Sequence, residues 1–225
     1  DDLKNVPGIV FRQNDGSLHI SEPCIVKNLD SLSIPSFHLI EKDFYYRGKN
    51  ASAVVLASRG CPLQCSYCSF GSHSCLSYRR RSISPVLEEI QTALSSHPIL
   101  FLDFEDENIS FDRVFFLTLL REIKQRFQGR LELRAMNGLY PPTLDEEILR
   151  EMKDAGFKEL NLALVTTSPS QLKNFCRANV QNSFEKVVKY AFSIGLSVVA
   201  YIIVGAPGQN PQESLQDLLY LAKKN

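Results

Sequence analysis

Short apolar runs alternate with longer amphipathic segments from residue 53 onward, and the alternation repeats five times. The first run is continuously apolar at its start, as expected of a strand buried on both faces. The predicted strands are AVVLASR (53–59), ILFLDF (99–104), LELRAM (131–136), KELNLAL (158–164) and LSVVAYIIVG (196–205). Strands that alternate with helices at this spacing predict βαβ units and a parallel sheet, either open or curled into a barrel.

Helix boundary signals separate the predicted strands. The first helix is predicted to begin with Ser84 as N-cap and Pro85 at the first helical position. The third is predicted to open with Thr143 and Glu146, which have capping-box spacing. Glycines are predicted to end three of the helices, at Gly129, Gly156 and Gly195. The predicted cap of the last helix consists of Asn210, Pro211 and Glu213.

The first 50 residues have a different pattern. VPGIVFRQNDGSLHI predicts a hairpin around Asp15 and Gly16, and the Ser/Pro-rich stretch 31–39 suits a linker. We therefore expect residues 1–50 to form a linker and hairpin segment that follows an upstream domain, and residues 51–225 to form a partial barrel. Because the last predicted helix is not followed by a further strand, we expect the chain to be part of a longer polypeptide.

Charge and composition exclude some classes of function. The 225 residues carry 25 basic and 25 acidic side chains, so the chain has no general field that would attract nucleic acid or an anionic membrane. No stretch approaches the roughly 18 apolar residues of a membrane span, and the first residues do not have the pattern of a signal peptide. We expect a cytoplasmic protein, in which six cysteines favour metal binding or reactive thiols over disulfides.

Three cysteines, Cys61, Cys65 and Cys68, lie directly after the first predicted strand. In parallel α/β folds ligands collect at the carboxyl ends of the strands, so this loop is where we expect chemistry. Three thiolates can bind three irons of a 4Fe–4S cluster and leave the fourth iron open to a substrate or cofactor.

Two other ligand sets are compatible with these cysteines. A ferredoxin-like cluster would need a fourth thiolate, from Cys75 or Cys176. A structural zinc ion would need His73, which lies five residues after Cys68 and would complete a Cys3His site. The zinc site would make this chain a non-catalytic metal-binding module.

The spacing Cys-x3-Cys-x2-Cys, with Tyr67 before the last cysteine and a strand before the first, resembles the radical S-adenosylmethionine superfamily. The resemblance extends from residue 53 to residue 225. It implies a partial parallel (β/α) barrel of about five βα units, preceded by the hairpin and linker. It also implies a 4Fe–4S cluster on the three cysteines, bound S-adenosylmethionine, reductive cleavage to a 5′-deoxyadenosyl radical, and a reductant such as flavodoxin or ferredoxin.

The same resemblance implies which residues contact the cofactor. Tyr67 matches an aromatic residue near the adenine, and Asp106 and Glu107, in DFEDEN, match acids that accept from the methionine ammonium. Arg177 matches an arginine able to pair with the methionine carboxylate. In strand four, Thr166 could reach the ribose, although VTT replaces the usual Glu or Gln followed by Ser; a degenerate domain that binds the cofactor without cleaving it therefore remains an alternative. The residues that match the adenine-binding strand are Ile203, Gly205, Pro207 and Gly208, followed by Gln209 in place of the more usual acid.

Three further stretches resemble the cobalamin-associated branch of this superfamily: the N-terminal VPGIVFRQNDGSL with LDSLSIP, the basic run YRRRS (78–82), and NGLYPPTLDEEILREMKDAGF (137–157). They imply a cobalamin-binding domain upstream of residue 1, and methyl transfer to an unactivated carbon of an unknown substrate. An isolated basic run is usually solvated, so Arg79, Arg80 and Arg81 are only weak candidates for a ligand contact.

Overall fold

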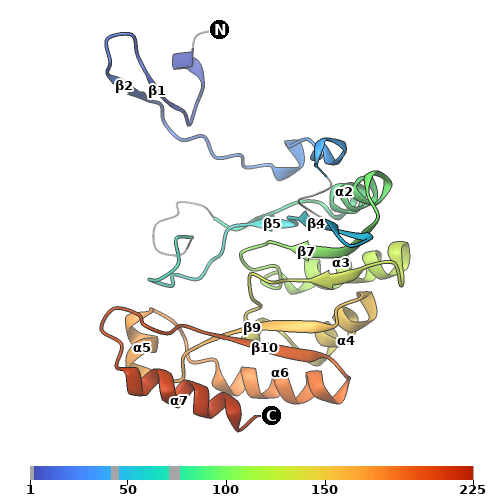
Figure 1. Cartoon of the computed structure of the whole chain (residues 1–225), viewed down its shortest axis with the longest axis vertical. Coiled ribbons are helices and arrows are strands. Elements are labelled where there is room, and N and C mark those ends of the chain that lie inside the picture. The colour runs from blue at the N-terminus through green and yellow to red at the C-terminus, as the bar shows by residue number, and fades with distance from the viewer. Residues whose placement is uncertain (1–2, 42–45, 71–76, 225) are drawn as a thin grey trace.

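The computed structural model describes residues 3–41, 46–70 and 77–224. Parallel strands and the helices packed against them form the main part of the molecule, and the N-terminal hairpin stands apart from this part (Figure 1). The predicted α/β fold with a partial parallel barrel is confirmed. In the described residues, no helix is long and apolar enough to cross a membrane.

Two groups of strands make up the partial barrel. The first sheet has the order β3 (Tyr46–Arg47), β4 (Asn50–Val55), β7 (Ile99–Phe104) and β8 (Glu132–Arg134), and only the β3–β4 pair is antiparallel. The second is the parallel pair β9 (Glu159–Val165) and β10 (Ser197–Ile202). Parallel bridges from Leu133 to Phe157 and from Leu139 to Leu162 connect the two groups. The five parallel strands therefore form one curved layer.

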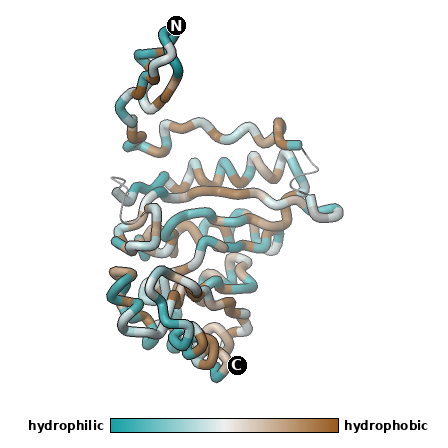
Figure 2. Tube along the Cα trace, turned by 60° about the vertical axis from the view of Figure 1, so that its left-hand side comes forward, coloured by the Kyte–Doolittle hydropathy of each residue, from teal (hydrophilic) through white to brown (hydrophobic). Residues whose placement is uncertain are grey.

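The helices alternate with these strands along the chain. They are α2 (Ile83–Ser96), α3 (Arg113–Phe127), α4 (Glu146–Ala155), α5 (Pro169–Asn174), α6 (Gln181–Ser193) and α7 (Pro211–Ala222). Figure 2 shows hydrophobic stretches along strands in the middle of this part, while hydrophobic and hydrophilic segments alternate along the helices. The fully buried side chains between the layers include five large aromatic ones: Phe104, Phe116, Phe127, Phe157 and Phe184. Each such ring contributes about 1.5–3 kcal/mol of burial free energy, which makes this layer the core.

The N-terminal segment consists of a separate hairpin and a following stretch that packs on the barrel. The hairpin of β1 (Val10–Arg12) and β2 (Leu18–Ile20) is antiparallel, as predicted around Asp15 and Gly16. The following stretch contains the short 3-10 turns η2 (Leu29–Ser31) and η3 (Phe37–Leu39), and a further one, η1 (Leu3–Asn5), precedes β1. Leu29 and Phe37 are buried, so this stretch packs on the barrel and does not cross solvent freely.

Two predicted helix starts are wrong. Helix α2 begins at Ile83 with Ser82 as N-cap, two residues before the predicted cap Ser84. Both the amide and the hydroxyl of Ser82 donate to the carboxylate of Asp30, and this tertiary contact ends the extended chain there. Helix α4 is capped by Asp145, whose carboxylate accepts from the Ile148 amide at 2.9 Å.

Thr143, the predicted cap of α4, belongs to the 3-10 turn η4 (Pro141–Thr143). Its hydroxyl donates to the Tyr140 carbonyl at 2.7 Å. The predicted cap of α7 is confirmed, and it is a capping box, because Asn210 and Glu213 exchange side-chain and backbone hydrogen bonds. The end of α4 at Gly156 is also confirmed. There φ is +123°, and a Cβ atom would lie 2.5 Å from the Leu131 carbonyl oxygen, so this position requires glycine.

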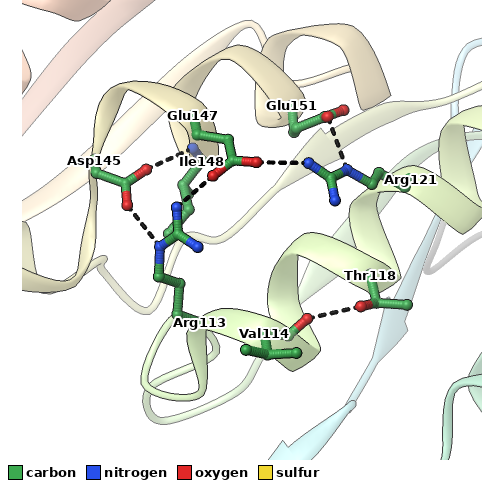
Figure 3. Close-up of polar contacts among 8 residues, drawn as sticks. All are labelled: Arg113, Val114, Thr118, Arg121, Asp145, Glu147, Ile148 and Glu151. Atoms are coloured by element: carbon green, nitrogen blue, oxygen red, sulfur yellow. Dashed lines mark hydrogen bonds and ion pairs between the residues drawn. The ribbon is translucent and has the colours of Figure 1, made fainter.

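Arginines of α3 pair with acids of α4 on the surface (Figure 3). Arg113 contacts Asp145 at 2.7 Å and Glu147 at 2.5 Å. Arg121 contacts Glu147 at 2.7 Å and Glu151 at 2.9 Å. Most of these side chains are about half exposed, so solvent weakens the attraction within each pair, and the pairs contribute little to stability.

Candidate functional site

The cysteine loop lies at the carboxyl end of β4. It begins after β5 (Ser58–Arg59), which pairs antiparallel with β6 (Arg79–Arg80), so the chain leaves and returns at the same point. Cys65 is buried, and Cys61 and Cys68 are half-buried. The Cys68 amide donates to the Cys65 carbonyl at 3.1 Å, which closes a tight turn between the last two cysteines.

Residues 106–108, which we call the 106–108 anchor, hold the first side of this loop. The carboxylate of Asp106 accepts from the Ala57 amide at 3.1 Å and from both the amide and hydroxyl of Ser58 at 2.5 Å. The next acid, Glu107, accepts from the Gly60 amide at 2.9 Å and pairs with Arg59 at 3.3 Å. These two acids after β7 thus fix the chain that enters the cysteine loop.

Asn108 completes the anchor at a sulfur atom. It is buried, and its Nδ2 donates to Cys61 Sγ at 3.7 Å. The other end of the amide, Oδ1, is buried without a hydrogen-bond partner in the described part of the chain. Among the described residues, Nδ2 is therefore the end of the amide that has a hydrogen-bond partner.

Burial decides the role of Asp106. The side chain is 3% exposed, and burial raises its pKa to about 6, against the hydrogen bonds from Ser58 and Ala57 that lower it. Both carboxylate oxygens accept hydrogen bonds from the protein. The predicted acceptor of an ammonium group is thus turned toward the backbone of residues 57 and 58.

Residues 174–177, which we call the 174–177 loop, hold the second side of the cysteine loop. The Ser66 amide donates to the Phe175 carbonyl at 3.0 Å, and the Ser66 hydroxyl donates to the Asn174 carbonyl at 2.7 Å. Tyr67 is 41% exposed and packs the edge of its ring on Phe175, with 5.1 Å between the ring centroids.

Arg177 reaches the middle cysteine from this loop. Its Nη1 donates to Cys65 Sγ at 3.4 Å, and its Nη2 donates to the Ala163 carbonyl at 3.2 Å. The guanidinium also lies 4.7 Å from the centroid of the Tyr140 ring. The structure therefore brings Arg177 to the loop of Tyr67 and the cysteines, although the sequence places the arginine more than 100 positions away.

Helix α7 fixes the chain between β9 and this loop. Thr166 is buried, and its hydroxyl donates to the Asp217 carboxylate at 2.7 Å. The same carboxylate accepts from the amide of Thr167 at 2.6 Å and from its hydroxyl at 2.5 Å. The predicted ribose contact, Thr166, is thus turned toward α7.

Glu213, one turn earlier in α7, binds the same segment. Its carboxylate accepts from the hydroxyls of Ser170 and Ser168, the latter at 2.7 Å, and from the side-chain amide of Gln171 at 3.1 Å. These hydrogen bonds lower the pKa of Glu213 to about 2. The role of Asp217 was missed in the sequence; the signal that could have found it is a carboxylate directly before the apolar run LLYLA (218–222) of the last helix.

The turn after β10 lies at the same carboxyl edge of the sheet. The Ile203 amide donates to the Val165 carbonyl at 2.8 Å, which joins the ends of β9 and β10. Gln209 donates to the Ile203 carbonyl at 3.2 Å and accepts from the Ala206 amide at 3.1 Å. Gly205 and Pro207 lie within this turn, and Gly205 has a φ of +77° that glycine adopts readily.

The basic run before α2 is engaged within the protein. Arg81 pairs with the buried Glu89 at 2.5 Å, and Arg80 pairs with Asp112 at 3.1 Å. Arg79 donates to the Ser77 carbonyl at 3.3 Å and also to the Val26 carbonyl. These contacts tie β6 to its neighbours.

The donor set fits a group that prefers sulfur ligands. Three thiols lie within eight residues, and N–H donors are directed at the sulfur atoms of Cys61 and Cys65. Within 3–41, 46–70 and 77–224, no three His, Cys, Asp or Glu side chains are arranged as a metal site. His73 and Cys75, the predicted fourth ligands of a zinc site and of a closed cluster, lie outside the described residues.

Comparisons with known proteins agree on one family. Residues 55–221 match the model described as the radical SAM superfamily. An uncharacterized methyltransferase of Pyrococcus horikoshii is 25% identical over 223 residues, which are 99% of this chain and 48% of the relative. The anaerobic magnesium-protoporphyrin IX monomethyl ester cyclase of Rubrivivax gelatinosus is 27% identical over an alignment of 230 positions, which covers 99% of this chain and 40% of the relative.

A solved structure shares the fold. It is that of the radical S-adenosylmethionine methyltransferase TsrM from Kitasatospora setae with cobalamin and a 4Fe–4S cluster bound, and it superposes with a TM-score of 0.76 at 17% identity. The superposition covers 99% of this chain and 45% of that one. The chain therefore spans about half the length of the curated relatives that it matches.

Proposed function

This chain belongs to the radical SAM superfamily, and we propose from that premise that it is the core of an enzyme that cleaves S-adenosylmethionine reductively. In this proposal Cys61, Cys65 and Cys68 hold a 4Fe–4S cluster with one iron left for the cofactor. The observation that carries it is the cysteine loop itself, anchored from both sides at the carboxyl edge of a parallel sheet. When bound, the cluster supplies the electron that cleaves the sulfonium and yields a 5′-deoxyadenosyl radical.

The residues around the loop divide between two proposed tasks. Tyr67, Ile203, Gly205 and Pro207 are proposed to line the site of the adenosyl group, because they lie on the loop and on the turn after β10. The other predicted contacts, Asp106, Glu107, Thr166 and Arg177, are engaged with backbone, α7 or sulfur. We propose that these four act on the cofactor through the segments that they position.

Cobalamin use and methyl transfer are proposals for the whole protein. They are supported by the methyltransferase relative and by the cobalamin named for the TsrM structure. The cyclase relative shows that proteins similar to this chain have other reactions, so the substrate is proposed only as a molecule with an unactivated carbon. A low-potential reductant such as flavodoxin or ferredoxin, and the reducing cytoplasm, suit such a cluster.

Electron paramagnetic resonance on the anaerobically reconstituted, dithionite-reduced chain tests the proposal. We expect a reduced-cluster signal that changes on addition of S-adenosylmethionine. Changing Cys61, Cys65 and Cys68 together to Ala should abolish the signal, whereas Cys24→Ser should retain it, because Cys24 is exposed and lies in the N-terminal segment. Liquid chromatography of the products should detect 5′-deoxyadenosine only with the intact cysteines.

Metal analysis distinguishes the zinc alternative. A structural zinc ion on the three cysteines and His73 would be lost in His73→Ala, whereas a cluster on three thiolates would retain its iron. The family match supports the cluster. A folded wild-type chain that retains zinc and gives no iron signal would overturn the proposed function. A cluster whose signal changes with S-adenosylmethionine, without 5′-deoxyadenosine as product, would instead identify a domain that binds the cofactor without cleaving it.

A further inference from the structure

We propose that Arg177 and Asn108 are N–H donors to the sulfur ligands of the cluster and raise its reduction potential. This inference rests on the proposed function and adds a role for two residues of this chain. It differs from the contact implied by the sequence, in which Arg177 pairs with the methionine carboxylate.

The position of Arg177 supports a fixed contact with sulfur. Nη1 lies 3.4 Å from Cys65 Sγ, and Nη2 is held by the Ala163 carbonyl of β9 at 3.2 Å. The ring of Tyr140 lies 4.7 Å from the guanidinium carbon. The charge is therefore oriented by a strand and an aromatic ring outside the cysteine loop, and it does not depend on the conformation of that loop.

Asn108 provides a neutral donor at a second sulfur. Its Nδ2 lies 3.7 Å from Cys61 Sγ, and the residue is 5% exposed. It follows directly on Asp106 and Glu107, whose carboxylates bind the backbone of residues 57, 58 and 60. The donor and the chain that leads to Cys61 are thus parts of one hydrogen-bonded unit.

Hydrogen bonds and positive charge at the sulfur atoms favour the reduced cluster. Reduction adds a negative charge to a group that already carries thiolate ligands, and N–H donors and cations stabilise that charge. Arg177 brings a cation to the sulfur and is held by the Ala163 carbonyl and the Tyr140 ring, so it should have the larger effect. Asn108 carries no charge and should have a smaller effect in the same direction.

A redox titration without S-adenosylmethionine separates this role from a contact with the cofactor. Clusters are reconstituted in the wild type, Arg177→Gln, Arg177→Lys and Asn108→Leu, and the reduced fraction is followed by electron paramagnetic resonance. Arg150→Gln is the control, because it removes an exposed arginine of α4 that binds Tyr190. Iron and sulfide per chain and thermal unfolding are measured on each variant.

We expect the ratio of reduced to oxidised cluster at a fixed potential to fall about tenfold in Arg177→Gln, which equals 59 mV for a one-electron couple. The same ratio should fall about threefold in Asn108→Leu. In Arg177→Lys it should fall less than in Arg177→Gln, and in Arg150→Gln it should stay unchanged. If Arg177→Gln does not fold, Arg177→Lys and Asn108→Leu decide the test.

Equal potentials in all variants that bind a cluster would overturn the inference and leave the proposed function standing. If only the affinity for S-adenosylmethionine changed in the Arg177 variants, the arginine would be a cofactor ligand instead. A wild type without any cluster would overturn the proposed function itself, and this result is recognised by iron analysis before any titration.

Discussion

A carboxylate beside a metal-binding loop can either face a ligand or hold the loop, and burial separates the two roles at Asp106. Its side chain accepts three hydrogen bonds from residues 57 and 58. Removing these contacts would free the chain that leads to Cys61. The hydrogen bonds of Asp106 therefore help to set the position of the chain that enters the candidate site.

The raised pKa of Asp106 predicts a stability change with pH. Because its pKa is about 6 in the folded chain and 3.8 ordinarily, the folded state binds more protons than the unfolded state between about pH 4 and 6. The free energy of unfolding contributed by this group is thus highest at about pH 4 and falls as pH rises to about 6, by up to about 3 kcal/mol.

Urea unfolding of wild type and Asp106→Asn at pH 4, 5, 6 and 7 measures this change. The free energy of unfolding of the wild type, relative to that of Asp106→Asn, should fall from pH 4 to pH 6 and stay constant at higher pH. Asp154→Asn, an exposed aspartate of α4 that pairs with Lys124, serves as the control. Parallel curves for wild type and Asp106→Asn would show that folding does not raise the pKa of Asp106.

At the residue scale, spacing is enough to propose the three cysteines as ligands, but it carries no signal for the groups that hold their loop. Cys61, Cys65 and Cys68 are close in sequence, so their proximity follows from the chain itself. The partners of the loop come from 47 to 112 positions away, and only the fold brings them near. Arg177 was identified, but its contact with sulfur had no sequence signal.

At the element scale, the segment between β9 and α6 is held from two directions. Asp217 and Glu213 of α7 bind residues 166–171, and the cysteine loop binds residues 174–177. Helix α7 is thereby connected to the cysteines through a single short segment. A substitution in α7 that breaks these hydrogen bonds should therefore also alter the conformation of the 174–177 loop, which carries Arg177.

Removing the carboxylate of Asp217 should destabilise this segment. In Asp217→Ala, the hydroxyls of Thr166 and Thr167 and the Thr167 amide lose a buried acceptor, at a cost of about 1–3 kcal/mol. We expect a lower free energy of unfolding and faster hydrogen exchange at the Thr167 amide. Gln216→Ala on the same helix, at an exposed position, should change neither quantity, and equal behaviour of the two variants would contradict the role of Asp217.

Strands were predicted better than helix caps because the two depend on different information. The apolar runs at β7 and β9 follow from burial of the sheet, whichever helices pack against it. The start of α2 depends on Asp30, which is 52 residues before Ser82, so a local cap signal at Ser84 misplaced it. The short helix α5 was missed although Ser168 and Pro169 carry an N-cap signal.

At the scale of the whole molecule, five βα units were predicted from the alternation alone, and the parallel pairings agree with it. The packing of residues 29–39 on the barrel could not be predicted in this way. Its Ser and Pro content suits a linker, but the buried Leu29 and Phe37 decide its place. Composition describes what a segment can do in isolation, whereas burial depends on its neighbours.

The last helix and strand leave an apolar surface on the described chain. Leu215, Leu218 and Leu219 of α7 are 46%, 53% and 45% exposed, and among the described strands β10 pairs only with β9. An open strand edge and exposed leucines each favour association, because the edge hydrogen bonds and the apolar area gain a partner. We therefore expect the 225-residue chain to self-associate as its concentration rises.

Charge on this surface should suppress the association. Replacing Leu215 and Leu218 together by Lys should lower the association constant at least about tenfold, which corresponds to roughly 1.4 kcal/mol of lost apolar contact and added repulsion. Val114→Lys, at an exposed apolar position of α3, is the control and should leave association unchanged. Sedimentation equilibrium at several protein concentrations measures both variants. If the double variant associates as strongly as the control, the contact lies elsewhere, and the apolar face of α7 has no part in it.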